Sequence, residues 1–225
     1  MPSKQTPQNG QADSLSKEPH HKLMYQTPDM MIYDVFLAPG QSTAPHQHDN
    51  SYIFITFGDS EITVNSPGQP AQQMKLLSGT VRFAQGGFSH TVTADGSQPF
   101  HNLTIEFLNP ALTRAGCSCR GLDTDSICGC PNAPPLPANW SLRIGHLFLA
   151  GVTLEPGAVY DINSNLPNRF LVAVTPFDDI LDETHHEPAT IHVRLPQGRF
   201  HWLSPGPHKI QNASSQPVRF VKVEF

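Results

Sequence analysis

The sequence lacks long hydrophobic runs and is poor in charge, with 15% charged residues. No window approaches the roughly eighteen consecutive apolar residues that a transmembrane helix needs, and residues 1–22 lack the apolar run of a signal peptide. Basic residues are scarce, 14 Lys and Arg against 19 Asp and Glu, so the net charge is −5. Because nucleic acids and anionic membranes bind basic surfaces, we expect neither as a partner and expect a small-molecule ligand.

Helical patterns are missing as well. No stretch repeats apolar residues at spacings of three and four with capping residues on both sides. The 22 Pro and 16 Gly residues instead separate short runs rich in β-branched and aromatic residues, such as 31–37, 52–57, 61–64 and 103–107. Such runs are typical of strands, so the sequence predicts an all-β protein with little helix.

The chain repeats itself at an offset of 117 to 118 residues. Residues 37–40 match 154–157, and residues 98–107 match 216–225 in register. Matches at both ends of one segment indicate an internal duplication of a β-domain.

The repeat and the composition together predict four segments. Residues 1–22 are rich in Gln, Ser, Pro and Lys, and we expect a flexible tail because they have almost no apolar surface to bury. Residues 23–109 form the first β-domain, residues 110–140 a linker rich in Cys and Pro, and residues 141–225 the second β-domain.

Three of the twelve histidines follow a metal-binding pattern. His46 and His48 are two apart at the entrance to a predicted strand, so both imidazoles point to one face. His90 follows a turn dense in glycine. Neutral imidazoles are good ligands for Zn, Fe, Ni and Cu, whereas a single strand histidine is more often an ordinary hydrogen-bonded side chain.

These histidines belong to two short sequence patterns that also contain glycines at fixed positions. They are Gly40, His46, His48 and Gly58 in the first, and Gly79, Gln85, Gly87 and His90 in the second. Together they resemble the two motifs of the cupin family, with Gln85 in place of the family's Pro. The resemblance implies a jelly-roll barrel, or double-stranded β-helix, in each copy. The duplication makes the chain similar to a bicupin, with two tandem cupin barrels and a Cys-rich linker.

The same resemblance implies that His46, His48 and His90 hold one divalent transition metal: Fe, Zn, Ni, Mn or Cu. The glutamate that completes the family's ligand set is absent, because Ser51 stands at its position. Three histidines with open metal positions resemble the sites of cupin dioxygenases such as cysteine dioxygenase and acetylacetone dioxygenase. Open positions are what a catalytic metal needs.

In the second copy the offset aligns Asn163 and Asn165 with the histidine pair and His208 with the third histidine. Asn is a poor ligand for these metals, so we expect a degenerate barrel without a metal. Glu106 is a candidate for the missing acid of the first copy. Glu224 matches it in the second copy, which favours a structural role for both.

Five residues near the metal motif are candidates for a ligand pocket: Ser51, Tyr52, Phe57, Arg82 and Phe88. The aromatic members are equally explained as barrel core. If Arg82 faces the cavity, its guanidinium would bind a carboxylate substrate through two hydrogen bonds. Its position in the strand leaves that direction open.

The four cysteines, Cys117, Cys119, Cys128 and Cys130, form two Cys-x-Cys pairs. They allow a structural Zn site or two disulfides that join one pair to the other. Structural Zn sites more often space their cysteines by two residues, so we favour disulfides. Disulfides in turn favour a periplasmic or secreted protein over a cytoplasmic one.

Two further segments have ordinary interpretations. The acidic and histidine-containing stretch 178–187 is interpreted as a solvated loop rather than a cation site, and His201 and Trp202 as strand residues.

These features favour a metal-binding bicupin and, at the level of the family, a non-heme metal-dependent dioxygenase of a small organic molecule. The alternative is a non-catalytic module that binds a small molecule or a sugar, since a fold does not fix a function. Exposed barrel edges make a homodimer a candidate assembly.

Overall fold

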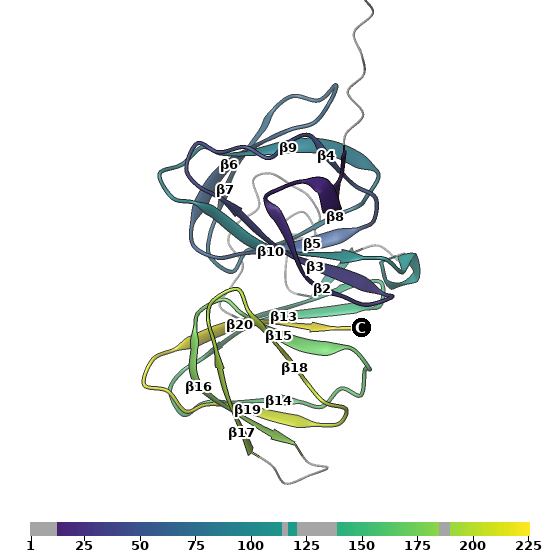
Figure 1. Ribbon diagram of the computed structural model, residues 1–225. Helices are drawn as coiled ribbons and strands as arrows, with labels where there is room; N and C mark the ends of the chain where they lie inside the picture. The colour runs from purple at the N-terminus through teal and green to yellow at the C-terminus, as the bar shows by residue number, and fades with distance from the viewer. Residues whose placement is uncertain (1–12, 114–116, 121–138, 185–189) are drawn as a thin grey trace, which may run out of the picture.

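The computed structural model describes four segments of the chain: 13–113, 117–120, 139–184 and 190–225. They form two β-barrels in tandem, coloured purple to teal and green to yellow in Figure 1. The only helical segments among these residues are two 3-10 turns, η1 (Leu15–Lys17) and η2 (Pro110–Leu112), which confirms the all-β prediction. No helix in the described part of the chain has the length and apolar character needed to cross a membrane.

Two five-stranded sheets build the N-terminal barrel. The first has the spatial order β1 (Asp13–Ser14), β4 (His46–His48), β9 (Phe88–Ala94), β6 (Ser60–Asn65) and β7 (Gln72–Leu76). The second has the order β2 (His21–Gln26), β3 (Met30–Leu37), β10 (Phe100–Phe107), β5 (Tyr52–Thr56) and β8 (Val81–Ala84).

The C-terminal barrel follows the same plan. Its larger sheet has the order β11 (Cys117–Arg120), β12 (Trp140–Ile144), β13 (Leu147–Leu154), β20 (Val218–Glu224), β15 (Arg169–Ala173) and β18 (Phe200–Trp202). Its smaller sheet has the order β14 (Val159–Ile162), β19 (His208–Asn212), β16 (Phe177–Thr184) and β17 (Thr190–Leu195). His201 and Trp202 are therefore strand residues, as predicted.

The largest apolar cluster lies between the two barrels, where the sheet of the first barrel that contains β3, β10 and β5 faces the six-stranded sheet of the second (Figure 1). Alternate residues of β5 and β10, such as Ile53 and Ile105, share this cluster with Phe170 and Val223 of the second barrel. The residues between them, such as Phe54, face the interior of their own barrel. Both faces of these strands are buried, but in β10 the residues on the interior face are polar: Asn102, Thr104 and Glu106.

Residues 13–22, which the sequence analysis assigned to the tail, include strand β1, the turn η1 and the start of β2. Strand β1 pairs with β4, and the buried Leu15 packs into a small apolar cluster on β3. Glu18 is also buried, and its carboxylate accepts a hydrogen bond of 3.1 Å from the backbone N–H of Ala44. The order of this segment comes from contacts with residues distant in sequence, which its local composition does not show.

In the part of the predicted linker that the structure describes, β11 pairs with β12 at the edge of the six-stranded sheet. The pairing of the cysteines stays a prediction. Their side chains lie outside the described residues: Cys117, Cys119, Cys128 and Cys130.

Replacing Ile105 by Ala is expected to lower the free energy of unfolding by about 2–5 kcal/mol, because it leaves a cavity between the barrels. Since the apolar cluster is shared, both barrels should unfold in one transition, measured by denaturant titration with Trp fluorescence and circular dichroism. The control is Ile191→Ala at a side chain that is 47% exposed, expected to change stability by about 0.5 kcal/mol or less. Two separate transitions would contradict the shared core.

Candidate metal centre and its cavity

Strand β4 places two histidines in the interior of the N-terminal barrel. His46 and His48 are 0% and 2% exposed, whereas Gln47 between them is more exposed. The alternation of side chains along a strand thus points both rings inward. Pairing with β9 sets His46 directly opposite His90.

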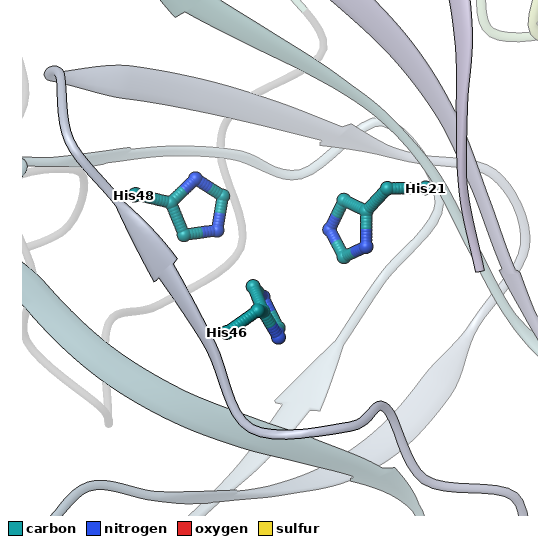
Figure 2. A group of neighbouring side chains, drawn as sticks. All are labelled: His21, His46 and His48. Carbon is teal, nitrogen blue, oxygen red and sulfur yellow. The ribbon is translucent and has the colours of Figure 1, made fainter. Parts of the chain in front are cut away.

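A third histidine comes from β2. Ligand atoms of His21, His46 and His48 all lie within 4.8 Å of one another, which is a spacing that could hold one metal ion. Figure 2 shows their three rings around one common space. The sequence analysis missed His21, because no motif marks it and it lies in the segment interpreted as a tail. The pairing of β2 with β3, which places His21 opposite Val35, brings it to the site.

His90 lies beside this group. It is buried, and its ring centroid is 4.5 Å from that of His46 and 5.1 Å from that of His48. It does not belong to the set of ligand atoms within 4.8 Å of one another. The structure therefore brings His46 and His48 together, with His21 as the third member and His90 as an adjacent fourth imidazole.

Neighbouring groups orient two of the rings. Nδ1 of His46 lies 2.9 Å from the carbonyl oxygen of Ala44, to which it donates, so Nε2 carries the lone pair. Nδ1 of His21 lies 2.6 Å from the carboxylate of Glu18. Burial opposes ionisation of this carboxyl, but His21 and two backbone N–H groups outweigh it and keep the pKa of Glu18 below its usual value. Such outer contacts fix the tautomer of a ligand histidine and raise its basicity.

Three buried ring nitrogens have no hydrogen-bond partner among the described residues: Nε2 of His46, Nδ1 of His48 and Nδ1 of His90. Burial, and then the neighbouring histidines, lower the pKa of all three rings, that of His90 to about 3. The rings are thus neutral near pH 7 and keep a lone pair. Buried nitrogens without partners call for an explanation, and this donor set fits a divalent transition metal.

Glu106, the candidate for the missing acid, is buried beside His48, with Oε1 3.8 Å from Nδ1. Burial raises the pKa of this carboxyl, while the backbone N–H of Asn50 opposes the shift. Glu106 is not part of the closely spaced group, which among the described residues contains three imidazoles and no carboxylate.

A cavity of about 370 Å³ adjoins the histidines, and all four of them line it. Of the five predicted pocket residues, Tyr52, Arg82 and Phe88 line it as well. Ser51 and Phe57 are not among its lining residues. Phe57 packs between the barrels instead, because its position in the alternation points it to the opposite face of the sheet.

The rest of the wall is mainly apolar, with Phe54, Ile62 and Phe100 among its members. Tyr52 stacks on His48, with ring centroids 3.9 Å apart. Arg82 is 6% exposed and, among the described residues that line the cavity, is the one with a permanent charge. Such a wall suits a small, largely apolar ligand.

Strand pairing identifies matching positions in the two barrels. Ile162 on β14 lies opposite His208 on β19, just as His46 lies opposite His90. Ile162 therefore takes the place of His46.

The offset of the sequence repeat aligned Asn163 with His46, and this alignment is wrong. Between the bridge Ser42–Thr93 and the pair His46–His90, the first barrel has three residues on one strand and two on the other. The matching stretch of the second barrel has equal numbers. The extra residue is a β-bulge, and it changes which side chains face the interior.

A buried polar network occupies the second barrel. Asp182 on β16 is 1% exposed, and its two oxygens lie 2.6 Å from Nδ1 of His208 and 2.9 Å from Nε2 of His201. The interpretation of 178–187 as a solvated loop is therefore wrong for 178–184, which lie in a strand.

A buried arginine fills more of this interior. Arg169 on β15 lies opposite Glu224, as Tyr52 lies opposite Glu106, and its guanidinium donates to the carbonyl oxygen of Ser164. The carboxylate of Asp182 and the terminal nitrogens of Arg169 thus find partners within the second barrel, whereas Nε of Arg169 and Nε1 of Trp202 have none among the described residues.

Comparisons with known proteins agree with this architecture. No protein-family profile matches the sequence, and no curated protein matches it. Among solved structures, AerE from Microcystis aeruginosa is 14% identical, with a TM-score of 0.62 over 92% of this chain and 97% of AerE. Oxalate decarboxylase from Bacillus subtilis is 12% identical, with a TM-score of 0.55 over 87% of this chain and 68% of its own.

A cupin 2 conserved barrel domain protein from Leptotrichia buccalis is 10% identical, with a TM-score of 0.50 over 91% of this chain and 87% of its own. At such low sequence identities, the structural similarity shows that the chain shares the fold of these proteins. The chain has the cupin fold, as two barrels in tandem, and the N-terminal one contains the three-histidine group.

Replacing His21, His46 or His48 by Ala is expected to lower the content of bound divalent metal about tenfold or more, because each change removes one ligand. Metal content of the purified protein by mass spectrometry and Zn titration by calorimetry measure this. His101→Ala, a histidine outside the group, is the control and should retain the metal. Loss of metal in His90→Ala together with retention in His21→Ala would instead identify His46, His48 and His90 as the ligands.

Replacing Asp182 by Asn is expected to lower the free energy of unfolding at neutral pH by about 1–3 kcal/mol, because two buried histidine contacts weaken. Burial opposes ionisation of this carboxyl, but the hydrogen bonds of His201 and His208 outweigh it, so the pKa of Asp182 lies below its usual value. A carboxyl with a depressed pKa stabilises the fold above its unfolded pKa of about 3.9, and this stability is lost as the pH falls further.

The difference between the wild type and Asp182→Asn should therefore shrink as denaturant titrations are moved below about pH 4. Asp179→Asn is the matched control, because its partner His192 is an exposed side chain, and it should cost about 0.5 kcal/mol or less. A difference that is independent of pH would contradict a buried ionised Asp182.

Proposed function

We propose that the N-terminal barrel binds one divalent transition metal through His21, His46 and His48 and acts as a non-heme metal-dependent oxygenase on a small organic molecule. The observation that carries the proposal is the group of three inward-facing imidazoles within 4.8 Å of one another, which borders a cavity of about 370 Å³. A metal site that opens onto a mostly apolar cavity is suited to chemistry on a ligand rather than to a purely structural role.

The ligand set supports catalysis in two ways. Three neutral imidazoles leave the full charge of a divalent ion in place and leave coordination positions open, so such an ion supplies Lewis-acid or redox chemistry when bound. Glu18 and the carbonyl of Ala44 hold two of the rings in orientation. The aromatic and aliphatic wall excludes water from the substrate and binds its apolar part.

A non-catalytic binding module is the second candidate. The cavity favours it, because the walls are formed by side chains of the barrel itself and do not need a metal to define their shape. The mainly apolar wall supports a small molecule better than a sugar, which would need many polar partners.

Three wider predictions belong to the same proposal. Descent of both barrels from one duplicated domain is supported by their matching strand orders and pairings. A homodimer through exposed barrel edges and a periplasmic or secreted location rest on the sequence.

Protein loaded with Fe(II) is expected to consume oxygen with at least one member of a panel of diketones, thiols and flavonols, measured with an oxygen electrode. His48→Ala and wild-type protein treated with a chelator should fall to the rate of buffer, because the metal position is then lost. His101→Ala should keep the wild-type rate. Metal-replete protein that binds a panel member without consuming oxygen would support the binding module instead.

A further inference from the structure

Three aromatic rings pack together in the interior of the second barrel. Phe220 on β20 is 1% exposed, and its ring centroid lies 5.8 Å from that of Tyr160 and 6.1 Å from that of Phe177. Both neighbours meet it edge to face, which is an arrangement that aromatic rings prefer. The three rings belong to the apolar cluster of this barrel or pack against it. The second barrel thus fills part of its interior with aromatic side chains.

Strand pairing finds the position of the central ring in the first barrel. Phe220 lies opposite Ala173, the last residue of β15, and Asn102 lies opposite Thr56, the last residue of β5. The strands involved hold the same places in their sheets, in the orders β13-β20-β15 and β3-β10-β5. Asn102 therefore takes the place of Phe220.

The two neighbouring rings are also replaced. Tyr160 follows Val159, which pairs with β19, and Thr43 follows Ser42, which forms the matching bridge with β9. Thr43 therefore takes the place of Tyr160.

Phe177 begins β16 and pairs with Leu195, the last residue of β17. Ser60 begins β6 and pairs with Leu76, the last residue of β7. Ser60 therefore takes the place of Phe177. Its Oγ is buried without a hydrogen-bond partner among the described residues.

Small polar residues thus stand where the second barrel has a group of aromatic rings, and all three are buried. Asn102 and Thr43 line the cavity. Phe100, at the place of Val218, returns one ring to this region. It also lines the cavity, and it meets Phe54 edge to face with ring centroids 6.2 Å apart. The exchange leaves space beside aromatic rings that have room for a further ring.

A hydrogen bond inside the cavity wall limits the polar part of a ligand. Oγ1 of Thr104 donates to Oδ1 of Asn102 over 2.8 Å. This bond uses the acceptor of the Asn102 amide, so the groups that the amide offers to a ligand are the N–H donors of Nδ2. A ligand that lies against Asn102 should therefore have a hydrogen-bond acceptor.

We propose that the cavity binds a neutral aromatic compound, whose ring takes the place that the ring of Phe220 has in the second barrel and whose acceptor group is bound by Nδ2 of Asn102. The inference rests on the proposed function for the identity of the site and deepens it by naming the ligand class. It does not require the metal. The residues that replace the three rings are uncharged, and the aromatic wall provides edge-to-face contacts to the ligand.

The test is calorimetric titration of the full chain with acetophenone, which has one aromatic ring and one carbonyl acceptor. Cyclohexyl methyl ketone is the matched probe, because it keeps the carbonyl and the size but has a saturated ring. Acetophenone should bind about threefold or more tightly, since contacts between aromatic rings contribute beyond the area that they bury. Equal binding of the two ketones by the wild type would overturn the proposal.

Asn102→Leu tests the polar contact, because it removes the amide and keeps a side chain of similar size. Ethylbenzene, which lacks the carbonyl of acetophenone, is the reference ligand. The variant should lower the ratio of acetophenone affinity to ethylbenzene affinity about threefold or more, because only acetophenone can accept the hydrogen bond. Asn163→Leu, at an exposed side chain of the second barrel, should leave the ratio unchanged. The proposal fails if Asn102→Leu leaves it unchanged as well.

Asn102→Phe tests the position of the ring. It introduces into the first barrel the ring that Phe220 provides in the second, so it should occupy the place of the ligand and abolish acetophenone binding. Asn163→Phe makes the same substitution at an exposed side chain and should bind acetophenone as the wild type does. Unchanged binding by a folded Asn102→Phe variant would contradict the proposal, and Asn102→Leu decides the matter if Asn102→Phe does not fold.

Performing the titrations with metal-loaded and chelated protein separates this inference from the oxygenase proposal. Selective binding of acetophenone in both states without oxygen consumption by any aromatic compound would leave the inference standing and remove the oxygenase. Oxygen consumption with non-aromatic substrates and no preference for an aromatic ring would do the reverse.

Discussion

The apolar layer between the two barrels is the contact on which the rest of the structure depends. It buries one face of β5 and β10 against the second barrel, so residues such as Ile53 and Ile105 have no freedom to turn inward. Because side chains alternate along a strand, this fixes Tyr52 and Phe54 toward the cavity. Tyr52 in turn stacks on His48. The second barrel thus fixes the direction of the side chains that line the cavity, although none of the described lining residues belongs to it.

The two barrels share one architecture but differ in what their interiors contain. In the second, the interior carries its own carboxylate, Asp182, and its own cation, Arg169, and each finds partners within the barrel. In the first, bulky apolar side chains and unpartnered imidazole nitrogens surround a cavity. Buried polar groups without partners are costly, so a ligand or ion that satisfies them binds with that free energy in its favour. The same plan therefore gives an interior with a paired carboxylate and arginine in one case and a cavity bordered by unpartnered imidazole nitrogens in the other.

The strands, the fold and the direction of two histidines could be predicted from the sequence, because they depend on neighbouring residues. The strand character of 52–57 and 103–107 follows from their residues, and the all-β cupin fold followed from them together with the glycine and histidine spacing. The inward direction of His46 and His48 follows from their separation by one residue. His21 and Glu18 were missed because their role depends on a strand that folds back over β3 and on contacts to Ala44, which no local pattern encodes.

The sequence by itself determined the strands, the two barrels and the paired histidines of β4, since strand propensity and alternation act over a few neighbouring residues. The tertiary structure decided which third imidazole joins them, which aromatic rings line the cavity rather than the layer between the barrels, and which residue of the second barrel matches His46. A single extra residue before His46 shifts the match between the barrels by one position. Phe54 lines the cavity, whereas Phe57 packs in the layer between the barrels, because they lie on opposite faces of the sheet. These outcomes depend on the register of strands far apart in the chain, which pairing and burial fix only when the whole fold is assembled.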